Sequence, residues 1–134
     1  KYKKFLPTKF EQRFKCIEWL NFQTASQGPM LGQAHHFLKF NKGKSKYSEE
    51  RYHKEAERIY DVMNTKLKES KYLAGDEYTI ADIAAWPWVA RFEWHQIDIK
   101  KYEHVADWYT NISNREAVQK GYDIPSIGAS IPKI

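Results

Sequence analysis

Arg51 is the side chain in this sequence that is best placed to bind an anion. It follows Ser48, Glu49 and Glu50, residue types that suit the start of a helix. A cation in the first helical turn is disfavoured by the helix dipole, so its presence there suggests a compensating role, such as holding a carboxylate beside free backbone N–H groups. The alternative is a weak surface ion pair with Glu55, one turn further on. The residues alone leave both interpretations open.

Two other groups of reactive side chains are not expected to bind a metal or to act as a nucleophile. His35 and His36 are adjacent, and neighbours on a helix point about 100° apart, so they cannot share one metal ion. The sequence has no His-x-x-x-His motif and no cysteine pair, so we predict no metal site. Cys16 lies within an amphipathic segment, where nothing is suited to stabilise a thiolate. We therefore expect a core or half-buried cysteine.

Three tryptophans, Trp86, Trp88 and Trp94, follow one another closely in an apolar segment. Aromatic residues in such a segment more often fill a core than form a stacking surface. We assign two of them to the core and leave one open as a residue that lines a cleft. No Ser–His–Asp arrangement, phosphate-binding loop or paired carboxylates stand out above background.

Composition narrows the class of protein. A chain of 134 residues is one domain by size, and no segment is apolar enough to cross a membrane. One cysteine excludes an internal disulfide and fits a reducing compartment such as the cytoplasm. Residues 1–71 carry 16 Lys and Arg against 8 Asp and Glu, but the bases alternate with acids or lie in the loop at 41–47. We therefore predict a solvated surface and no nucleic-acid partner.

Helical spacing dominates the first half of the chain. The first helix is expected over residues 8–27, with Gly28-Pro29 breaking or kinking it before helix resumes over 30–40. A second long helix is expected to start at Ser48 as its N-cap and to end near Ser70. Its apolar face is predicted to consist of Tyr52, Ala56, Ile59, Tyr60, Met63 and Leu67. One face of the first helix is predicted from the spacing of Phe10, Phe14, Ile17, Asn21 and Thr24, and Cys16, Trp19 and Phe22 widen this apolar face.

Thr79 and Asp82 form the spacing of an N-terminal capping box at the start of a very apolar helix. That helix is expected over residues 79–95 and should be buried at the centre of the domain. Two shorter helices are expected over 101–113 and up to Gly121, followed by an extended tail over 122–134. With no strand pattern, the sequence predicts one all-α domain over 1–134, a bundle of about five helices.

Two segments resemble a known family. Residues 72–83, which hold the capping box, look like the central core helix of the C-terminal domain of cytosolic glutathione transferases. The run Gly28-Pro29-Met30-Leu31-Gly32-Gln33, followed by His35-His36-Phe37, resembles the nu-class bacterial enzymes and their fungal prion-related relatives. The Glu50-Arg51-Tyr52 and Trp86-Pro87-Trp88 segments fit the same group, and the resemblance extends over roughly residues 7–125.

The resemblance implies a site and a substrate. In nu-class enzymes the arginine that matches Arg51 reaches bound glutathione, which is a substrate of these enzymes, and the reaction is mainly the reduction of small disulfides rather than conjugation of electrophiles. The helix around Gly28-Pro29 lines the cleft between domains, although packing against another helix explains its small residues as well. The expected substrate-cleft residues are Met30, Gln33, His36, Phe37 and Trp88.

The same resemblance implies a larger protein. Family members carry an N-terminal thioredoxin-like domain that activates the glutathione thiol, and they form homodimers. We expect that domain to be absent from this chain, so no catalytic residue is predicted here and the chain alone should be weak or inactive. The alternative is a stand-alone helical protein–protein interaction module, which the basic first half mildly favours and which has no need of a glutathione cleft.

Overall fold

The computed structural model describes residues 4–125, 128 and 130–134. These residues are all-α, as predicted, and contain no strand beyond an isolated bridge between Tyr72 and Gly75. The elements in chain order are α1 Phe10–Phe22, the π-helical turn η1 Gln23–Gln27, α2 Gly28–Ala34, the π-helical turn η2 His35–Phe40, α3 Lys46–Glu69, α4 Ile80–Val89, the 3₁₀ turns η3 Phe92–His95 and η4 Ile99–Lys101, α5 Glu103–Ser113 and α6 Glu116–Tyr122.

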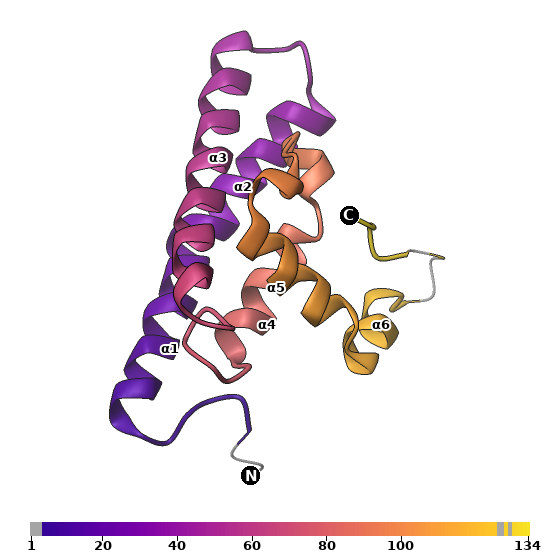
Figure 1. Ribbon diagram of the computed structural model, residues 1–134. Coiled ribbons are helices and arrows are strands. Elements are labelled where there is room, and N and C mark those ends of the chain that lie inside the picture. The colour runs from indigo at the N-terminus through magenta and orange to yellow at the C-terminus, as the bar shows by residue number, and fades with distance from the viewer. Residues whose placement is uncertain (1–3, 126–127, 129) are drawn as a thin grey trace.

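A long helical hairpin forms one side of the molecule. The chain climbs through α1 and α2 and returns antiparallel along α3, while α4 and α5 pack against this hairpin and α6 lies at the opposite edge (Figure 1). Leu31 on α2 and Ile59 and Met63 on α3 are fully buried between these layers. Burying aliphatic side chains of this size contributes roughly 1.5–3 kcal/mol each, so this contact is a main source of stability.

Of the break or kink expected at Gly28-Pro29, the break is absent, because helical backbone continues from Phe10 to Phe40. The π-helical turn η1 absorbs the proline: the N–H of Gly28 donates to the carbonyl oxygen of Gln23, five residues back. Pro29 then falls in the first turn of α2, where its missing N–H is tolerated. The proline therefore changes the hydrogen-bond register without ending the helix.

The five residues predicted to define the apolar face of the first helix do not meet the core, whereas Cys16, Trp19 and Phe22, which were expected to widen that face, do. Phe10 is 81% exposed, Phe14 64% and Ile17 39%, and Asn21 and Thr24 are exposed as well. The buried residue of α1 is Cys16, which confirms the core interpretation of this cysteine. Because both faces of α1 carry apolar residues, the helical period alone could not tell which face meets the core.

The long helix α3 has the predicted end but a different start. Its N-cap is Ser45 rather than Ser48, because Ser45 Oγ accepts a hydrogen bond from the Ser48 backbone N–H at 3.3 Å. Serines three residues apart compete for this role, and the one that lies in extended backbone becomes the cap.

The capping box of α4 forms as predicted and does more than start the helix. Asp82 Oδ2 accepts the Thr79 N–H at 3.0 Å, and Thr79 Oγ1 accepts the Ala81 N–H at 3.3 Å. Asp82 Oδ1 also accepts the Leu73 N–H at 3.0 Å and the Trp108 indole N–H at 2.9 Å. The carboxylate, fully buried, thus ties the preceding loop and α5 to α4.

The C-terminal third departs from the predicted boundaries. The helix expected to reach residue 95 ends at Val89, and the chain continues in the 3₁₀ turn η3. The described part of the chain after Tyr122 forms no helix, and it contacts α5, because Tyr109 Oη donates to the Pro132 carbonyl oxygen at 2.8 Å.

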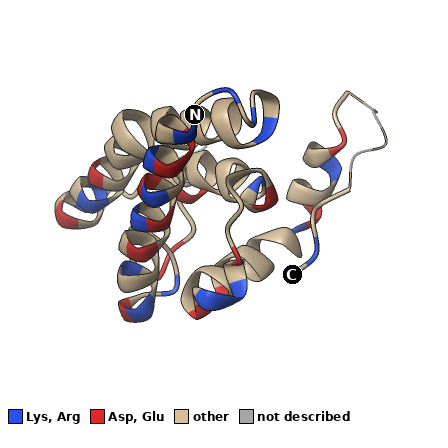
Figure 2. Ribbon diagram, turned by 90° about the horizontal axis from the view of Figure 1, so that it is seen from above, with Lys and Arg blue, Asp and Glu red and all other residues tan. Residues whose placement is uncertain are grey.

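Charges are mixed over the molecule. Lys and Arg alternate with Asp and Glu along the helices instead of collecting on one face (Figure 2). In the described part of the chain, no helix is long and apolar enough to span a membrane.

Candidate functional site

Arg51 lies in the second turn of α3 and not in the first turn as predicted, because the helix begins at Lys46 instead of after Ser48, and its side chain is exposed. Its guanidinium carbon is 5.9 Å from the centre of the Tyr52 ring, and hydrogen bonding to the Tyr47 side chain is the main cause that raises the pKa of Arg51. A permanently charged, solvent-facing guanidinium between two tyrosines is well suited to meet an anionic ligand.

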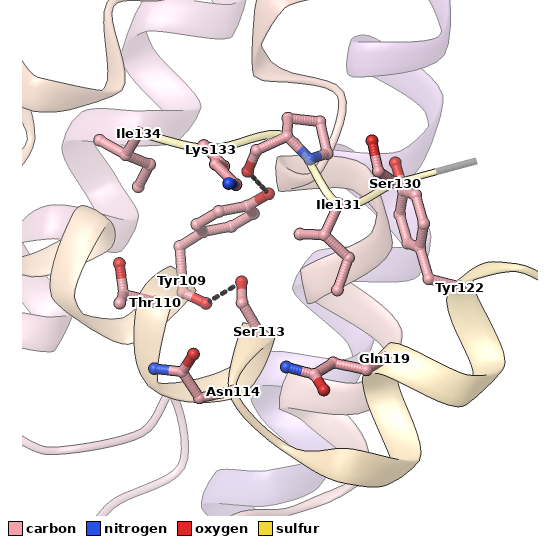
Figure 3. A pocket seen from close by; sticks show the side chains of 11 residues that line it. Tyr109, Thr110, Ser113, Asn114, Gln119, Tyr122, Ser130, Ile131, Lys133 and Ile134 are labelled. Carbon is pink, nitrogen blue, oxygen red and sulfur yellow. Dashed lines mark hydrogen bonds between the residues drawn. The ribbon is translucent and has the colours of Figure 1, made fainter. Parts of the chain in front are cut away.

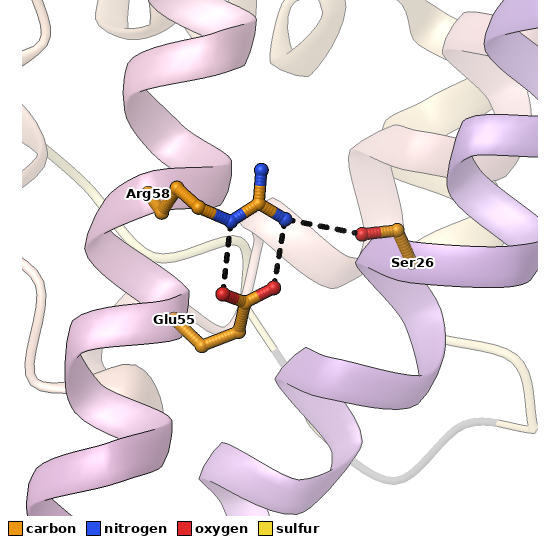
Figure 4. Close-up of polar contacts among 3 residues, drawn as sticks. All are labelled: Ser26, Glu55 and Arg58. Carbon is orange, nitrogen blue, oxygen red and sulfur yellow. Dashed lines mark hydrogen bonds and ion pairs between the residues drawn. The ribbon is translucent and has the colours of Figure 1, made fainter.

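The alternative role for Arg51, a pair with Glu55, is not what the structure shows. Glu55 instead receives two hydrogen bonds from Arg58, at 2.9 Å from Nε and 2.7 Å from the terminal nitrogen (Figure 4). The same guanidinium reaches Ser26 Oγ at 3.4 Å, so it links α3 to η1. Hydrogen bonding to Arg58 lowers the pKa of Glu55, and Arg51 contributes only a smaller, more distant attraction.

One of the expected cleft residues, Phe37, contacts Tyr52, which is the chain neighbour of Arg51. Phe37 stacks on Tyr52, with ring centres 5.4 Å apart and planes 6° from parallel. Met30 and Gln33 project from the same side of the helix as Phe37, because positions three or four apart share a face. Gln33 and His36 are exposed and Met30 is half-buried. This helix side, with Phe37 at its centre, is the candidate wall of the cleft.

Trp88 belongs to a different place. It packs against Gly28 and Gly32, where an added Cβ would lie 3.4 Å and 3.8 Å from the indole. The two glycines face the opposite side of the helix from Met30 and Phe37. The close approach of the Gly-Pro-Met-Leu-Gly segment is therefore to another helix, α4, and Trp88 does not share a wall with Phe37.

A cavity of about 550 Å³ lies between α5, α6 and the tail (Figure 3). Among the residues that line it, Ser113 Oγ donates to the Tyr109 carbonyl oxygen at 2.7 Å, and burial raises the pKa of Tyr109 to about 12. Neither Arg51 nor Phe37 lines it. Its lining is Tyr109, Thr110, Ser113, Asn114, Gln119, Tyr122, Ser130, Ile131, Pro132, Lys133 and Ile134.

The structure also joins residues that the sequence did not connect. His35 Nε2 lies 2.7 Å from His95 Nε2, and His95 Nδ1 lies 3.1 Å from Tyr60 Oη. The two histidines are 60 positions apart, so no local sequence pattern could predict their contact. Within the described residues, no group of three or more His, Cys, Asp or Glu side chains is arranged to hold a metal ion.

Comparisons with known proteins bear on this geometry. Residues 28–116 match the family described as the glutathione S-transferase C-terminal domain. The chain is 41% identical over 113 residues to the disulfide-bond oxidoreductase YfcG of Escherichia coli (strain K12), which covers 84% of this chain and 53% of that protein.

Solved structures of glutathione transferases are similar to this chain as well. A glutathione transferase from Burkholderia graminis, with two glutathione molecules bound per subunit, superposes with a TM-score of 0.84 at 31% identity over 93% of this chain and 55% of its own. A Pseudomonas putida glutathione transferase with one bound glutathione disulfide gives 0.85 at 32% identity over 92% and 56%. The chain spans about half the length of the curated relatives it matches.

Proposed function

The chain belongs to the family of glutathione S-transferase C-terminal domains, and from this premise we propose that it is the helical half of a glutathione-dependent disulfide reductase. In this role it contributes to the binding of glutathione and forms one wall of the cleft for a second substrate, a small disulfide or an electrophile. We place the protein in the cytoplasm, where a lone buried Cys16 stays reduced.

The observation that carries the proposal is the exposed Arg51 in its setting. Glutathione carries two carboxylates, and a guanidinium makes paired hydrogen bonds to such groups. Arg58, the other arginine on α3, is already engaged by Glu55. The bound glutathione and glutathione disulfide named for the Burkholderia and Pseudomonas structures support the choice of ligand.

The stack of Phe37 on Tyr52 supports the second part of the proposal. It joins Phe37 of the 28–40 helix to Tyr52, the neighbour of Arg51 on α3, and Gln33 and His36 of the same helix are exposed. A substrate held by its carboxylate at Arg51 would extend its remaining atoms over these side chains. Chemistry at the glutathione sulfur is assigned to the thioredoxin-like domain that the family implies, and no catalytic residue is assigned to this chain.

Turnover of bis(2-hydroxyethyl) disulfide with glutathione tests the function. The full gene product should reduce the disulfide, and the 134-residue chain alone should show little or no turnover. In the full gene product, Arg51→Ala should raise KM for glutathione, while Lys46→Ala, which removes an exposed cation at the start of the same helix, should leave it unchanged. Equal KM values for the two variants would contradict the assignment of Arg51.

Phe10, Phe14 and Ile17 form an exposed apolar stripe on α1, which supports a homodimer. If two copies of α1 pack antiparallel about a point between Lys15 and Cys16, Phe14 of one copy faces Ile17 of the other, and Arg13 faces Glu18. The stripe is therefore complementary to itself in both apolar and charged positions, as a two-fold interface requires. We propose that a second copy of the chain covers it.

Sedimentation of two variants tests the dimer. Phe14→Ser should shift the protein toward monomer, while Phe40→Ser, which changes an equally exposed phenylalanine on η2, should not. A monomeric unmodified protein that captures another protein through α1 would instead favour the second candidate, a helical interaction module. The large exposed aromatic side chains of α1 are the observation that keeps this candidate.

A further inference from the structure

A chain of hydrogen bonds runs from the core to the surface through three side chains, Tyr60 on α3, His95 on η3 and His35 on η2. Tyr60 and His95 are fully buried, and His35 is half-buried. The two imidazole rings are 5° from parallel with centres 4.7 Å apart, and their Nε2 atoms are 2.7 Å apart. The ring centres are farther apart than the Nε2 atoms, so the two nitrogens point toward each other at hydrogen-bond distance.

The direction of this chain follows from what each atom can donate. The Tyr60 hydroxyl has His95 Nδ1 as its side-chain partner and is buried, so its proton must point to that nitrogen. His95 then carries its own proton on Nε2 and donates it to His35 Nε2. The reverse order would leave the Tyr60 proton buried without an acceptor. His35 must therefore hold its proton on Nδ1.

The surrounding contacts keep both imidazoles neutral and in place. Burial lowers the pKa of His95 to about 3, and burial followed by the charge of Arg91 lowers the pKa of His35. The backbone around His95 is anchored by Gln96, whose side chain donates to the Leu38 carbonyl oxygen on η2 at 3.2 Å. The two histidine-bearing turns are thus tied together beyond the histidines themselves.

The outer end of the chain of hydrogen bonds reaches an aromatic surface. His35 Nδ1 has no protein partner among the described residues, and it is not a buried atom. The His35 ring lies between Trp88, at 5.7 Å and 26° from parallel, and Trp94, at 5.2 Å and 74°. The guanidinium carbon of Arg91 is 5.0 Å from the centre of the Trp94 ring.

We propose that Tyr60 and His95 are positioning residues that fix His35 as a neutral donor, and that His35, Trp88 and Trp94 bind a flat aromatic molecule carrying a carboxylate. Trp88 and Trp94 are only half-buried, so the parts of their rings that remain exposed can meet the aromatic body. The Nδ1–H of His35 and the charge of Arg91 favour the carboxylate. This surface lies on the opposite side of the 28–40 helix from Phe37, so it is separate from the proposed glutathione cleft.

The first test reads the tautomers directly. Long-range ¹H–¹⁵N correlation spectra of the 134-residue chain at pH 7.5 should show His35 protonated only on Nδ1 and His95 only on Nε2. Tyr60→Phe keeps the ring but removes the donor, so both histidines should become tautomer mixtures. Tyr102→Phe, which changes a ring 5.4 Å from Tyr60 without touching the hydrogen bonds, should leave them fixed. A His35 ring protonated on Nε2, or charged at this pH, would overturn the proposal.

The second test uses 2-naphthoate as the ligand and follows the Trp88 and Trp94 indole N–H signals. Its affinity should exceed that of 2-naphthylmethylamine, which has the same rings with a cation, by roughly tenfold. His35→Phe should weaken 2-naphthoate roughly tenfold and Tyr60→Phe roughly threefold. Equal binding by the unmodified chain and both variants, or equal binding of the two naphthalenes, would overturn the site. Neither measurement involves glutathione, so failure here leaves the proposed function standing.

Discussion

Asp82 and His95 are both fully buried polar side chains, yet they belong to two different kinds of network. The Asp82 carboxylate receives hydrogen bonds from Leu73, Thr79 and Trp108, and these three residues are themselves buried. The network of His95 instead leads outward through His35 to solvent. A closed network of this kind stabilises a fold, whereas an open one also determines which hydrogen-bonding group is presented at the surface.

Removing the centre of the closed network should have the largest effect on stability. Asp82→Ala leaves the Leu73 and Thr79 N–H groups and the Trp108 indole N–H without their acceptor, so we expect a loss of about 3–5 kcal/mol in the free energy of unfolding by urea. Asp76→Ala, at an exposed acid in the preceding turn, should stay within about 0.5 kcal/mol of the unmodified chain. Similar values for the two variants would show that Asp82 is not the centre.

The open network should make stability depend on pH. The pKa of His95 is about 3 in the folded chain and ordinarily about 6.5, so the unfolded state binds the extra proton between these values. The stabilisation is complete above pH 6.5 and is lost as the pH falls toward 3, with a slope of up to about 1.4 kcal/mol per pH unit from this histidine. His35 acts in the same direction, and Tyr60 and Arg91 are the other titratable groups that face the pair.

Urea unfolding from pH 7.5 to pH 4.5 measures this dependence. His95→Gln removes the titrating ring, so its stability should be lower at pH 7.5 but should change less with pH. A slope that stays the same in His95→Gln would assign the acid sensitivity to other groups. Asp82 does not enter this comparison, because the unmodified chain and His95→Gln both keep its network intact.

Thr79→Ala separates the contribution of the capping hydroxyl from that of the Asp82 carboxylate in the closed network. It removes the hydroxyl that accepts the Ala81 N–H but leaves the Asp82 carboxylate with its other partners, so the expected cost is about 1 kcal/mol. Thr110→Ala, at an exposed threonine on α5 that bonds only within its own helix, is the matched control and should cost less. A loss as large as that of Asp82→Ala would mean that the cap, rather than the carboxylate, holds the network.

The smallest effect on stability is expected for Arg51→Ala. The side chain is exposed and makes no ion pair with the described residues, so the urea midpoint should stay within measurement error. A clear fall in the midpoint would show that Arg51 has a structural role, and the case for a ligand role would weaken.

Sequence reasoning succeeded where the physical cause is local. Thr79 and Asp82 are three residues apart, and the capping box follows from that spacing alone. The α3 face of Ala56, Ile59 and Met63 was equally readable, because one side of that helix is clearly polar and the other apolar.

Sequence reasoning failed where a residue's environment is set by a distant part of the chain or by another molecule. The contact between His35 and His95 depends on how two turns 60 residues apart are brought together. The stripe of Phe10, Phe14 and Ile17 has the pattern of a core face but is exposed, because amphipathic spacing does not say whether a helix meets its own chain or another. The site around Arg51 was found through the family resemblance more than through the residues.

Whether Arg51 binds glutathione is best measured by calorimetric titration of the full gene product with glutathione, by comparing the unmodified protein with Arg51→Ala and Lys46→Ala. We expect Arg51→Ala to weaken glutathione binding roughly tenfold or more, because a charge-assisted hydrogen bond to a carboxylate is lost, while Lys46→Ala binds like the unmodified protein. Unchanged affinity in Arg51→Ala would contradict the assignment of Arg51 as the glutathione-binding residue of this domain.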